Sequence, residues 1–272
     1  MGMRINTNVP AMNAHRQLMK TTSRLDKSLQ KLSSGLRINR AADDAAGLAI
    51  AESLRSQITG ARVAQRNGQD GISLVQTAEG ALAETMNMLQ RMRELAVQAA
   101  SGTLSDENRL SIQDEVDQLI EQIDSIATNT EFNGVVLLSA VSTITLQVGA
   151  EIGQTMNVTV NGADSADLYI NTGFAVSSAA NASTSLQQID SAISLVNGIR
   201  AGLGATQNRL EFTISTLSIQ EENASASESA IRDVDMALET VEFTRNQILV
   251  SAGVSMLAQA NMVPQTVLNL IG

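Results

Sequence analysis

A seven-residue apolar repeat limits what this chain can fold into more than any other feature of its sequence. Near the C-terminal end of the 272 residues, eight apolar residues follow one another at intervals of seven: Ile189, Val196, Leu203, Leu210, Leu217, Ala224, Ile231 and Leu238. Such a repeat places one apolar seam along a helix that packs against a partner helix. A helix from Leu186 to Leu238 would be roughly 80 Å long. A compact globule of this chain length has a radius of gyration of about 18 Å. We therefore expect an elongated, mainly α fold.

The composition agrees with helix-on-helix packing. The chain has no Trp, one Tyr and four Phe, so its core must be built from aliphatic residues and Met. Its two prolines, Pro10 and Pro264, leave the sequence between them without the residue that most often breaks helices. Long helices lying side by side are therefore the favoured architecture.

Charge and cysteine content exclude several functions. A net charge of −10 argues against binding to nucleic acid, which needs a basic surface. The absence of cysteine excludes disulfides, thiolate catalysis and cysteine-type zinc sites. We find neither the apolar core of a cleaved signal peptide nor an apolar run that could span a membrane. No nucleic-acid or membrane partner is expected.

Apolar periodicity predicts three further helical regions. Residues 5–36 show heptad-like spacing, which indicates an amphipathic helix. A second helix is predicted from about Asp43 to Ala100, with two neighbouring apolar stripes that imply packing on more than one side. A 3-4 repeat from Ile112 to Ile126 predicts a third helix. A last amphipathic segment extends over residues 235–271.

The period changes to two after Asn133-Gly134. Alternating apolar residues at 144–148 and 156–160 flank a Gly-containing turn, which predicts a β-hairpin. Residues 161–185 are rich in Ser, Asn, Ala and Gly, and we expect a loop with one short strand at Leu168 to Ile170. These signals divide the chain into residues 1–42, 43–138, 139–183, 184–234 and 235–272.

No constellation of residues predicts catalysis. The single histidine, His15, lies in a helical register, and we expect it on a helix face or an interface. Gly202-Leu203-Gly204 begins like a dinucleotide-binding loop, but Gln207 breaks the pattern. Acid pairs such as Asp43-Asp44 could in principle bind metal, but helix caps and solvated faces explain them better. We predict no catalytic residues, no metal site, no cofactor and no enzymatic activity.

The two terminal helices need partners. Burying one leucine contributes roughly 1.5–3 kcal/mol, whereas an isolated amphipathic helix in water is only marginally stable. The simplest partners are the opposite terminus and further copies of the chain. The residues predicted to pack in this way are Leu18, Leu25, Leu29, Leu32, Leu36, Leu249, Met256, Val263 and Leu270.

Several motifs give the chain a resemblance to bacterial flagellins. The N-terminal signature comprises residues 32–39 and 41–48, and the C-terminal one comprises residues 203–210 and 231–237. The similarity covers roughly residues 3–138 and 184–272. It also includes residues 5–8, 90–98 and 132–134.

This resemblance implies a function and a set of partners. It implies an inner core of paired terminal helices (1–42 and 235–272), an outer core of helices (43–138 and 184–234) carrying a hairpin, and polymerisation into a motility filament. It also implies an extracellular location reached by type III export without a cleaved signal, an export chaperone on the C-terminal helix, and contacts with filament-cap and hook-junction proteins. Between residues 138 and 185 there is room only for the hairpin, so the large variable outer domains of many flagellins are expected to be absent.

The resemblance further implies recognition by a host innate immune receptor. Arg91, Leu95 and Glu115 match positions at which flagellins of this type engage the vertebrate Toll-like receptor for flagellin. Arg91 and Leu95 are four residues apart, so they should project from one face of the helix. The alternative is that Leu95 belongs to ordinary helix packing and Arg91 to an assembly contact.

Two other functions would also explain part of the sequence. A hook-filament junction protein has terminal helices of the same type, but the match to the outer-core motifs disfavours it. A soluble coiled-coil tether would explain the heptads but not the signature at both ends of the chain.

Overall fold

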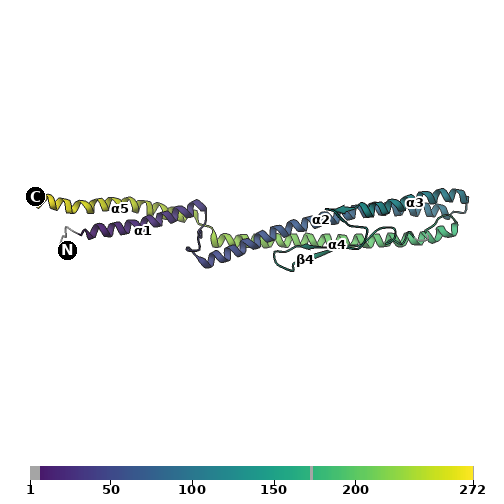
Figure 1. Cartoon of the computed structure of the whole chain (residues 1–272), viewed down its shortest axis with the longest axis horizontal. Coiled ribbons are helices and arrows are strands. Elements are labelled where there is room, and N and C mark those ends of the chain that lie inside the picture. The colour runs from purple at the N-terminus through teal and green to yellow at the C-terminus, as the bar shows by residue number, and fades with distance from the viewer. Residues whose placement is uncertain (1–6, 172–173, 272) are drawn as a thin grey trace. The chain divides into compact units, whose positions relative to one another are not determined.

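The computed structural model describes residues 7–171 and 174–271, with side chains described as far as residue 262. Within these residues the chain forms five helices: α1 (Val9–Ser34), α2 (Ala45–Ala100), α3 (Asp106–Asn129), α4 (Ala179–Arg232) and α5 (Met236–Ile271) (Figure 1). Two short antiparallel ladders join β1 (Glu131–Phe132) to β2 (Val135–Val136) and β3 (Ser142–Gln147) to β4 (Thr155–Val160). The predicted fold class, mainly α with long helices and a small hairpin, is confirmed.

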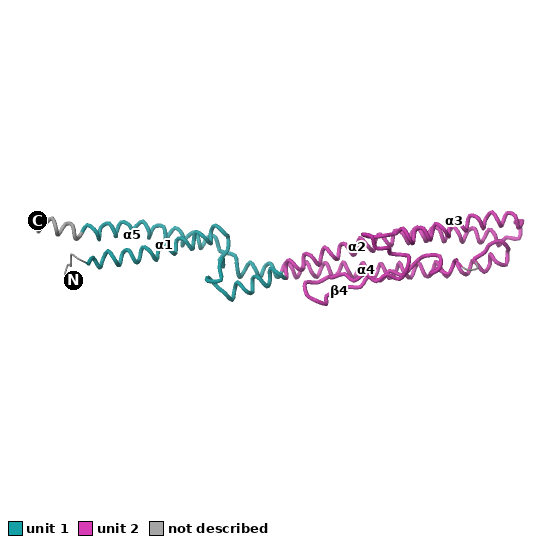
Figure 2. Tube along the Cα trace, viewed as in Figure 1, with its two compact units in different colours: residues 1–56, 223–272 teal, residues 57–222 magenta. Residues whose placement is uncertain are grey.

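The chain divides into two compact units (Figure 2). The terminal unit comprises the chain up to Ser56 together with the chain from Asn223, and the central unit comprises Gln57–Glu222. In the central unit three ion pairs join α2 to α4: Arg62–Glu221, Glu79–Arg200 and Arg93–Asp190. Residue numbers rise on α2 as they fall on α4, so these two helices are antiparallel.

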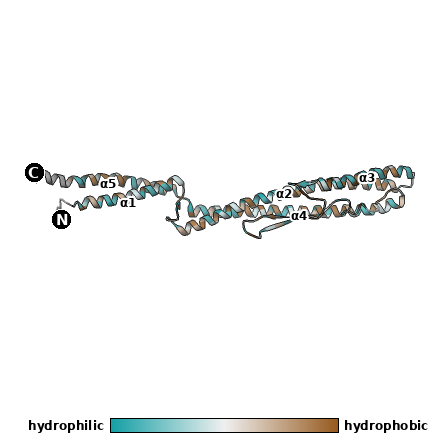
Figure 3. Cartoon of the chain, viewed as in Figure 1, coloured by the Kyte–Doolittle hydropathy of each residue, from teal (hydrophilic) through white to brown (hydrophobic). Residues whose placement is uncertain are grey.

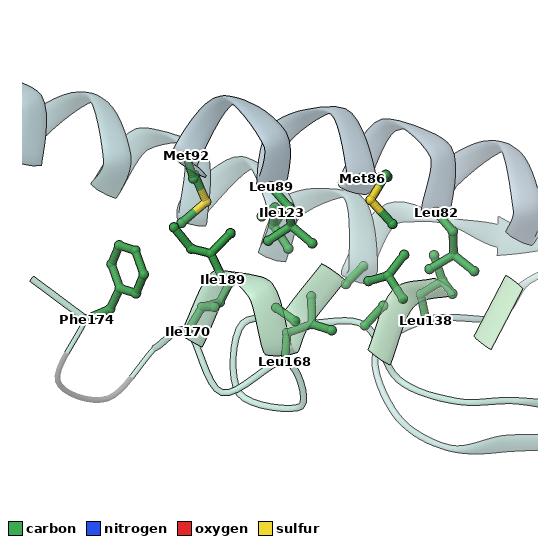
Figure 4. Close-up of a cluster of buried hydrophobic side chains, with 14 of the residues drawn as sticks. Leu82, Met86, Leu89, Met92, Ile123, Leu138, Leu168, Ile170, Phe174 and Ile189 are labelled. Atoms are coloured by element: carbon green, nitrogen blue, oxygen red, sulfur yellow. The ribbon is translucent and has the colours of Figure 1, made fainter. Parts of the chain in front are cut away.

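The predicted heptad seam is the core of the central unit over five of its eight repeats. The residues from Ile189 to Leu217 in this register are all buried, with exposures of 0–6%. Ile189, Val196 and Leu203 belong to one large cluster with apolar residues of α2 and α3 that include Leu82, Leu89 and Ile123, several of which Figure 4 shows. Leu210 and Leu217 belong to two smaller, separate clusters. Figure 3 shows apolar residues recurring along α4.

The sequence predicted that the seam would continue to Leu238 in a single helix, and it does not, although the division predicted between residues 234 and 235 falls within the observed break. Helix α4 ends at Arg232 and α5 begins at Met236, and Leu238 is 68% exposed. Polar groups cause the break. Asp235 caps α5 by accepting hydrogen bonds from the N–H groups of Ala237 and Leu238. The heptad register runs across this junction, so hydrophobic spacing alone could not reveal it.

Backbone hydrogen bonds join the linker that follows α1 to the linker that precedes α5. Gly35 ends α1 in the left-handed conformation, with a φ of 71°. The N–H of Arg37 then donates to the carbonyl of Arg232 at 2.6 Å, and the N–H of Val234 donates to that of Gly35 at 3.0 Å. The Arg37 guanidinium also donates to the carbonyl of Ile231. The α1–α2 and α4–α5 linkers are thus bonded to each other.

The predicted β-hairpin is confirmed. Strands β3 and β4 pair from Ser142 with Val160 to Gln147 with Thr155. Asn67 on α2 donates to the Gln147 carbonyl at 2.9 Å, which fixes the hairpin to the helix. The absence of a side chain at Gly60 lets the hairpin lie close to α2, because a Cβ at this position would lie 2.8 Å from the Cβ of Ala150 in the hairpin turn.

The predicted short strand at Leu168 to Ile170 is wrong. The N–H of Leu168 bonds to the Asp164 carbonyl and that of Ile170 to the Ser165 carbonyl, so this segment is a tight turn. Leu168 and Ile170 are 1% and 0% exposed, and both belong to the core cluster, with Ile170 next to Ile189 (Figure 4). The alternation of apolar residues arises because the turn buries Leu168 and Ile170, one on each side of the exposed Tyr169.

Candidate assembly surface on the terminal helices

Helices α1 and α5 pack against each other through small residues. Ala11, Thr21 and Ser28 on α1 are 5–9% exposed, and Asn246 on α5 is 6% exposed. A Cβ added at Gly253 would lie 3.1 Å from the Leu18 side chain, so the two helices approach closely there. The interface between the helices is consequently narrow and partly polar.

The leucines predicted to pack in the terminal helices lie around this seam and are not enclosed by it. Leu18, Leu25, Leu32 and Leu36 are half-buried, while Leu29 is 55% exposed. On α5, Leu249 and Met256 are 46% and 63% exposed. Val263 and Leu270 lie outside the residues whose side chains are described. A single chain therefore leaves much of this apolar surface in contact with water.

Exposed apolar side chains are dense on α5. Eight are between 46% and 68% exposed: Met236, Leu238, Val241, Ile248, Leu249, Val254, Met256 and Met262. The helix has only three charged residues in its 36, namely Glu239, Glu242 and Arg245. Val241, Ile248 and Leu249 line a hollow of about 670 Å³ along one face of the helix. Exposed apolar side chains gathered along a helix in this way mark a surface that binds other molecules.

Helix α1 differs from α5 in charge. It carries five cations, Arg16, Lys20, Arg24, Lys27 and Lys31, against one acid, Asp26. Lys31 pairs with Glu239 at 3.4 Å, and no other ion pair of these cations is found among the described residues. Next to this helix, backbone N–H groups of Arg40 and Asn39 donate to Asp43 and lower the pKa of its carboxyl group.

The three residues of the predicted receptor site divide into an exposed pair and a core residue. Arg91 donates to Glu115 at 2.8 Å and to Glu94 at 3.2 Å, and these bonds raise the pKa of the guanidinium. Leu95 is only 2% exposed. Our expectation that Leu95 shares an exposed face with Arg91 is therefore wrong, because the next turn of α2 faces the core formed with α3 and α4.

The structure also locates the residues considered for catalysis and metal binding. His15 is exposed on α1, and Asp44 caps α2 by accepting a bond from the Gly47 N–H at 2.9 Å. In residues 7–171 and 174–271, no group of three or more potential ligands could hold a metal ion. The same part of the chain contains no helix long and apolar enough to cross a membrane.

One ordered polar residue was not predicted. Arg109 is 7% exposed, and its guanidinium donates to the carbonyls of Ala99 and Ser101 and to Asp106. It thereby satisfies carbonyls at the C-terminal end of α2 and holds the turn into α3. The sequence offered one signal for it, since Arg109 is the only cation among the acids of α3.

Sequence comparison assigns both ends of the chain to one family. Residues 5–143 match the model of the bacterial flagellin N-terminal helical region, and residues 186–271 match that of the C-terminal helical region. A flagellin of Halalkalibacterium halodurans is 50% identical over 273 residues, covering 99% of this chain and all of that protein. A flagellin of Bacillus subtilis is 48% identical over 304 residues, with the same coverage.

Structural comparison supports the fold. The structure of a putative flagellar hook-associated protein from Vibrio parahaemolyticus superposes with a TM-score of 0.59, covering 70% of this chain and all of that one. At 17% sequence identity this likeness concerns the fold alone.

Proposed function

Because the chain belongs to the bacterial flagellin family, we propose that the terminal unit supplies the surface through which its copies associate in the filament. Flagellins are structural proteins that polymerise into the filament of the extracellular flagellum, and this chain is such a subunit. The observation that supports the assignment to the terminal unit is the uncovered apolar surface of α5, whose eight exposed side chains include Val241, Ile248 and Met256.

The free energy gained by burial favours the exposed apolar surface of α5, and not the central unit, as the site of association between copies. Covering a half-exposed Leu, Ile or Met contributes on the order of 1 kcal/mol, so eight such residues provide a large driving force for association. The central unit instead encloses its main apolar stripe between α2, α3 and α4. Its helix α3 exposes six acids, of which Asp106 and Glu115 are paired with arginines. The other four are Glu107, Asp114, Asp117 and Glu121, and identical copies of such a surface repel one another.

A pair of matched charge insertions tests the assignment. Ile248→Asp places a carboxylate on α5, whereas Leu110→Asp places one on the acidic face of α3, at a position of similar exposure (64% against 55%). We expect Ile248→Asp to abolish polymerisation and Leu110→Asp to leave it intact, as followed by sedimentation and electron microscopy. Normal filaments from a folded Ile248→Asp chain would show that this face of α5 is not an assembly surface.

Further partners are proposed on the same basis. An export chaperone would cover the apolar face of α5 before assembly, since this face would otherwise drive premature association. Filament-cap and hook-junction proteins would contact the terminal unit at the two ends of a filament, where no neighbouring copy covers it. Type III export without a cleaved signal remains part of this proposal.

Recognition by a host innate immune receptor is proposed for Arg91 and Glu115. Arg91 offers a planar guanidinium that is 51% exposed, and Glu115 lies beside it. Leu95 would act only indirectly, by holding α2 in the core. In a receptor reporter assay, Arg91→Ala monomer should lose signalling while its melting temperature stays near that of wild type.

Leu95→Ala should differ from Arg91→Ala, because it should change the stability of the chain. It should lower the free energy of unfolding by about 2–5 kcal/mol, because it leaves a cavity in the core. Wild-type monomer should signal and intact filament should signal weakly. Full signalling by folded Arg91→Ala would remove this residue from the site.

A further inference from the structure

The tip of the β3–β4 hairpin presents an isoleucine entirely to solvent. Ile152 is 104% exposed, the highest value among the exposed large apolar side chains of the described residues. The hairpin that carries it is nevertheless fixed, since Ala150 lies against Gly60 and Gln147 bonds to Asn67. An apolar side chain held rigidly in water loses little conformational entropy on binding, which is the property of an interface anchor.

A hollow of about 680 Å³ lies at the opposite end of the same hairpin. Its walls include Val141, which precedes β3, and Leu195 on α4, which are 67% and 42% exposed. Its lining also includes Gly198, where an added Cβ would meet nothing within 4 Å, so the hollow is open above the helix. Tyr169 completes the wall and is 72% exposed.

Tyr169 is held in an unusual backbone conformation. Its φ is +57°, a left-handed value that residues other than glycine rarely adopt. The burial of Leu168 and Ile170 on either side enforces it. Such conformations persist where the surroundings determine them, and they are common at ligand-binding positions. The aromatic ring is therefore part of a preformed wall.

The tip cannot fill the hollow of its own chain. The strands pair over six residues, from Ser142 with Val160 to Gln147 with Thr155. The hollow therefore lies about 20 Å from the tip along the hairpin. A second copy of the chain can bring its own tip to this place.

Backbone donors at the tip are complementary to an acceptor in the hollow, and the exposed carboxylate of Glu151 lies beside these donors. At the tip, the N–H groups of Glu151 and Gln154 are bonded within the turn, whereas no bond is found for those of Ile152 and Gly153 among the described residues. Gly153 has a φ of +88°, and successive N–H groups next to a left-handed residue form a site that attracts anions. The hollow supplies a carboxylate, Asp167, on its lining.

We propose that Ile152 of one copy inserts into the hairpin-base hollow of the next copy, with the tip N–H groups facing Asp167. The contact joins two different surfaces, so it is repeated from copy to copy without closing a dimer, as an open helical polymer requires. The proposal rests on the self-association proposed above and adds a second contact, in the central unit.

Disulfide cross-linking tests this contact cleanly because the chain has no cysteine. The double variant Ile152→Cys/Gly198→Cys is polymerised under reducing conditions and then oxidised. Each copy should bond to the one before and the one after it, giving a ladder of linked multimers in denaturing gels. The control is Ile152→Cys/Ile219→Cys, whose second cysteine lies elsewhere on α4 at a 57% exposed position.

A second variant covers the case in which the double variant fails to polymerise. Ile152→Asp should raise the critical concentration for polymerisation roughly 10- to 100-fold, whereas Glu151→Ala in the same turn should leave it within about twofold. Circular dichroism verifies that both variants keep their helices.

The outcomes separate this inference from the assembly proposal. A ladder in the test pair alone supports the contact. Wild-type filaments with equal cross-linking in both pairs, or an Ile152→Asp chain that polymerises like wild type, would overturn it while leaving the role of the terminal unit intact. Failure of wild-type chain to form filaments would instead contradict the family function.

Discussion

Individual ion pairs connect the long helices of the central unit, and one of them makes a specific prediction about pH. Arg62 donates to Glu221 at 2.6 Å, and Gln65 donates to the same carboxylate at 3.1 Å. These bonds, with that of Arg62 the larger, lower the pKa of Glu221 below its ordinary value of 4.5. The folded state therefore favours the charged form of this side chain.

The sign of the pH effect follows from this direction. The stabilisation is fully present above the unfolded-state pKa and is lost as the pH falls through the lower folded-state value. Glu221→Gln should thus melt at a lower temperature than wild type at pH 7, and the difference should shrink below about pH 4.5. Glu222→Gln, which removes the same charge one residue away, should change the melting temperature little. A Glu221→Gln difference that stayed constant from pH 7 to pH 3 would show that the ion pair contributes nothing.

At the level of single residues, the sequence identified exposed charge better than buried polarity. Arg91 and Glu115, which the resemblance assigns to one receptor site, bond directly to each other. The burial of Arg109 was not anticipated, because its partners are two backbone carbonyls that become neighbours only when the chain turns from α2 into α3. Side-chain patterns carry no information about such main-chain partners.

The glycines of α2 make a prediction at the level of the hairpin and its helix. A Cβ at Gly60 would lie 2.8 Å from the Cβ of Ala150 and 3.2 Å from its Cα, so a backbone would have to move. At Gly80 a Cβ would meet nothing within 4 Å. Gly80→Ala should therefore stabilise the chain by about 0.5–1 kcal/mol through helix propensity.

Gly60→Ala should gain the same helix propensity, but its Cβ should push Ala150 and the hairpin away from α2. We expect faster hydrogen exchange at residues 148–155 in Gly60→Ala, with no such change in Gly80→Ala. Exchange that is equally slow in both variants would mean that the hairpin does not depend on this contact.

The type of an element, helix or strand, could be predicted wherever a single apolar period ran along a segment that buries one face. The spacing of seven from Ile189 to Leu217 corresponds to residues that are all buried, and the alternation on β3 and β4 corresponds to a paired hairpin. Prediction failed where tertiary bonds decided the geometry. The apolar seam stops short of Leu238 where the Arg37 N–H donates to the Arg232 carbonyl from a distant part of the chain. The turn at Leu168 is held by two hydrogen bonds that Ser165 donates to Asp124.

The terminal helices show a related limit. Their leucines were predicted as packing residues, yet the seam between α1 and α5 buries Thr21, Ser28 and Asn246. Periodicity finds the apolar face of a helix, but it does not say which part of that face meets the same chain and which part is left for a partner. The assignment of Leu29 and Leu249 to contacts between copies stays a prediction.

At the scale of the whole molecule, the chain has one unit with an enclosed core and one with an uncovered apolar surface. The central unit buries its main stripe within three helices, whereas the terminal unit leaves most of α5 accessible. We expect a subunit of this kind to gain its remaining apolar burial in the polymer. We therefore expect the terminal unit to become covered on assembly.

Oxidation of methionine reports whether the terminal unit is covered in the filament. Five methionines of the terminal unit are 51–63% exposed in the single chain: Met12, Met19, Met236, Met256 and Met262. Met86, Met92 and Met156 in the central unit are at most 8% exposed and serve as internal controls. Accessible thioethers are oxidised readily to sulfoxides, and mass spectrometry resolves each site.

Monomer and filament of the wild-type chain are exposed to the same dose of hydrogen peroxide, and the sulfoxide at each methionine is measured over time. We expect rapid oxidation of the five terminal methionines in monomer, strong protection of these five in filament, and slow oxidation of the three controls in both. Equal oxidation of the terminal methionines in monomer and filament would contradict this expectation.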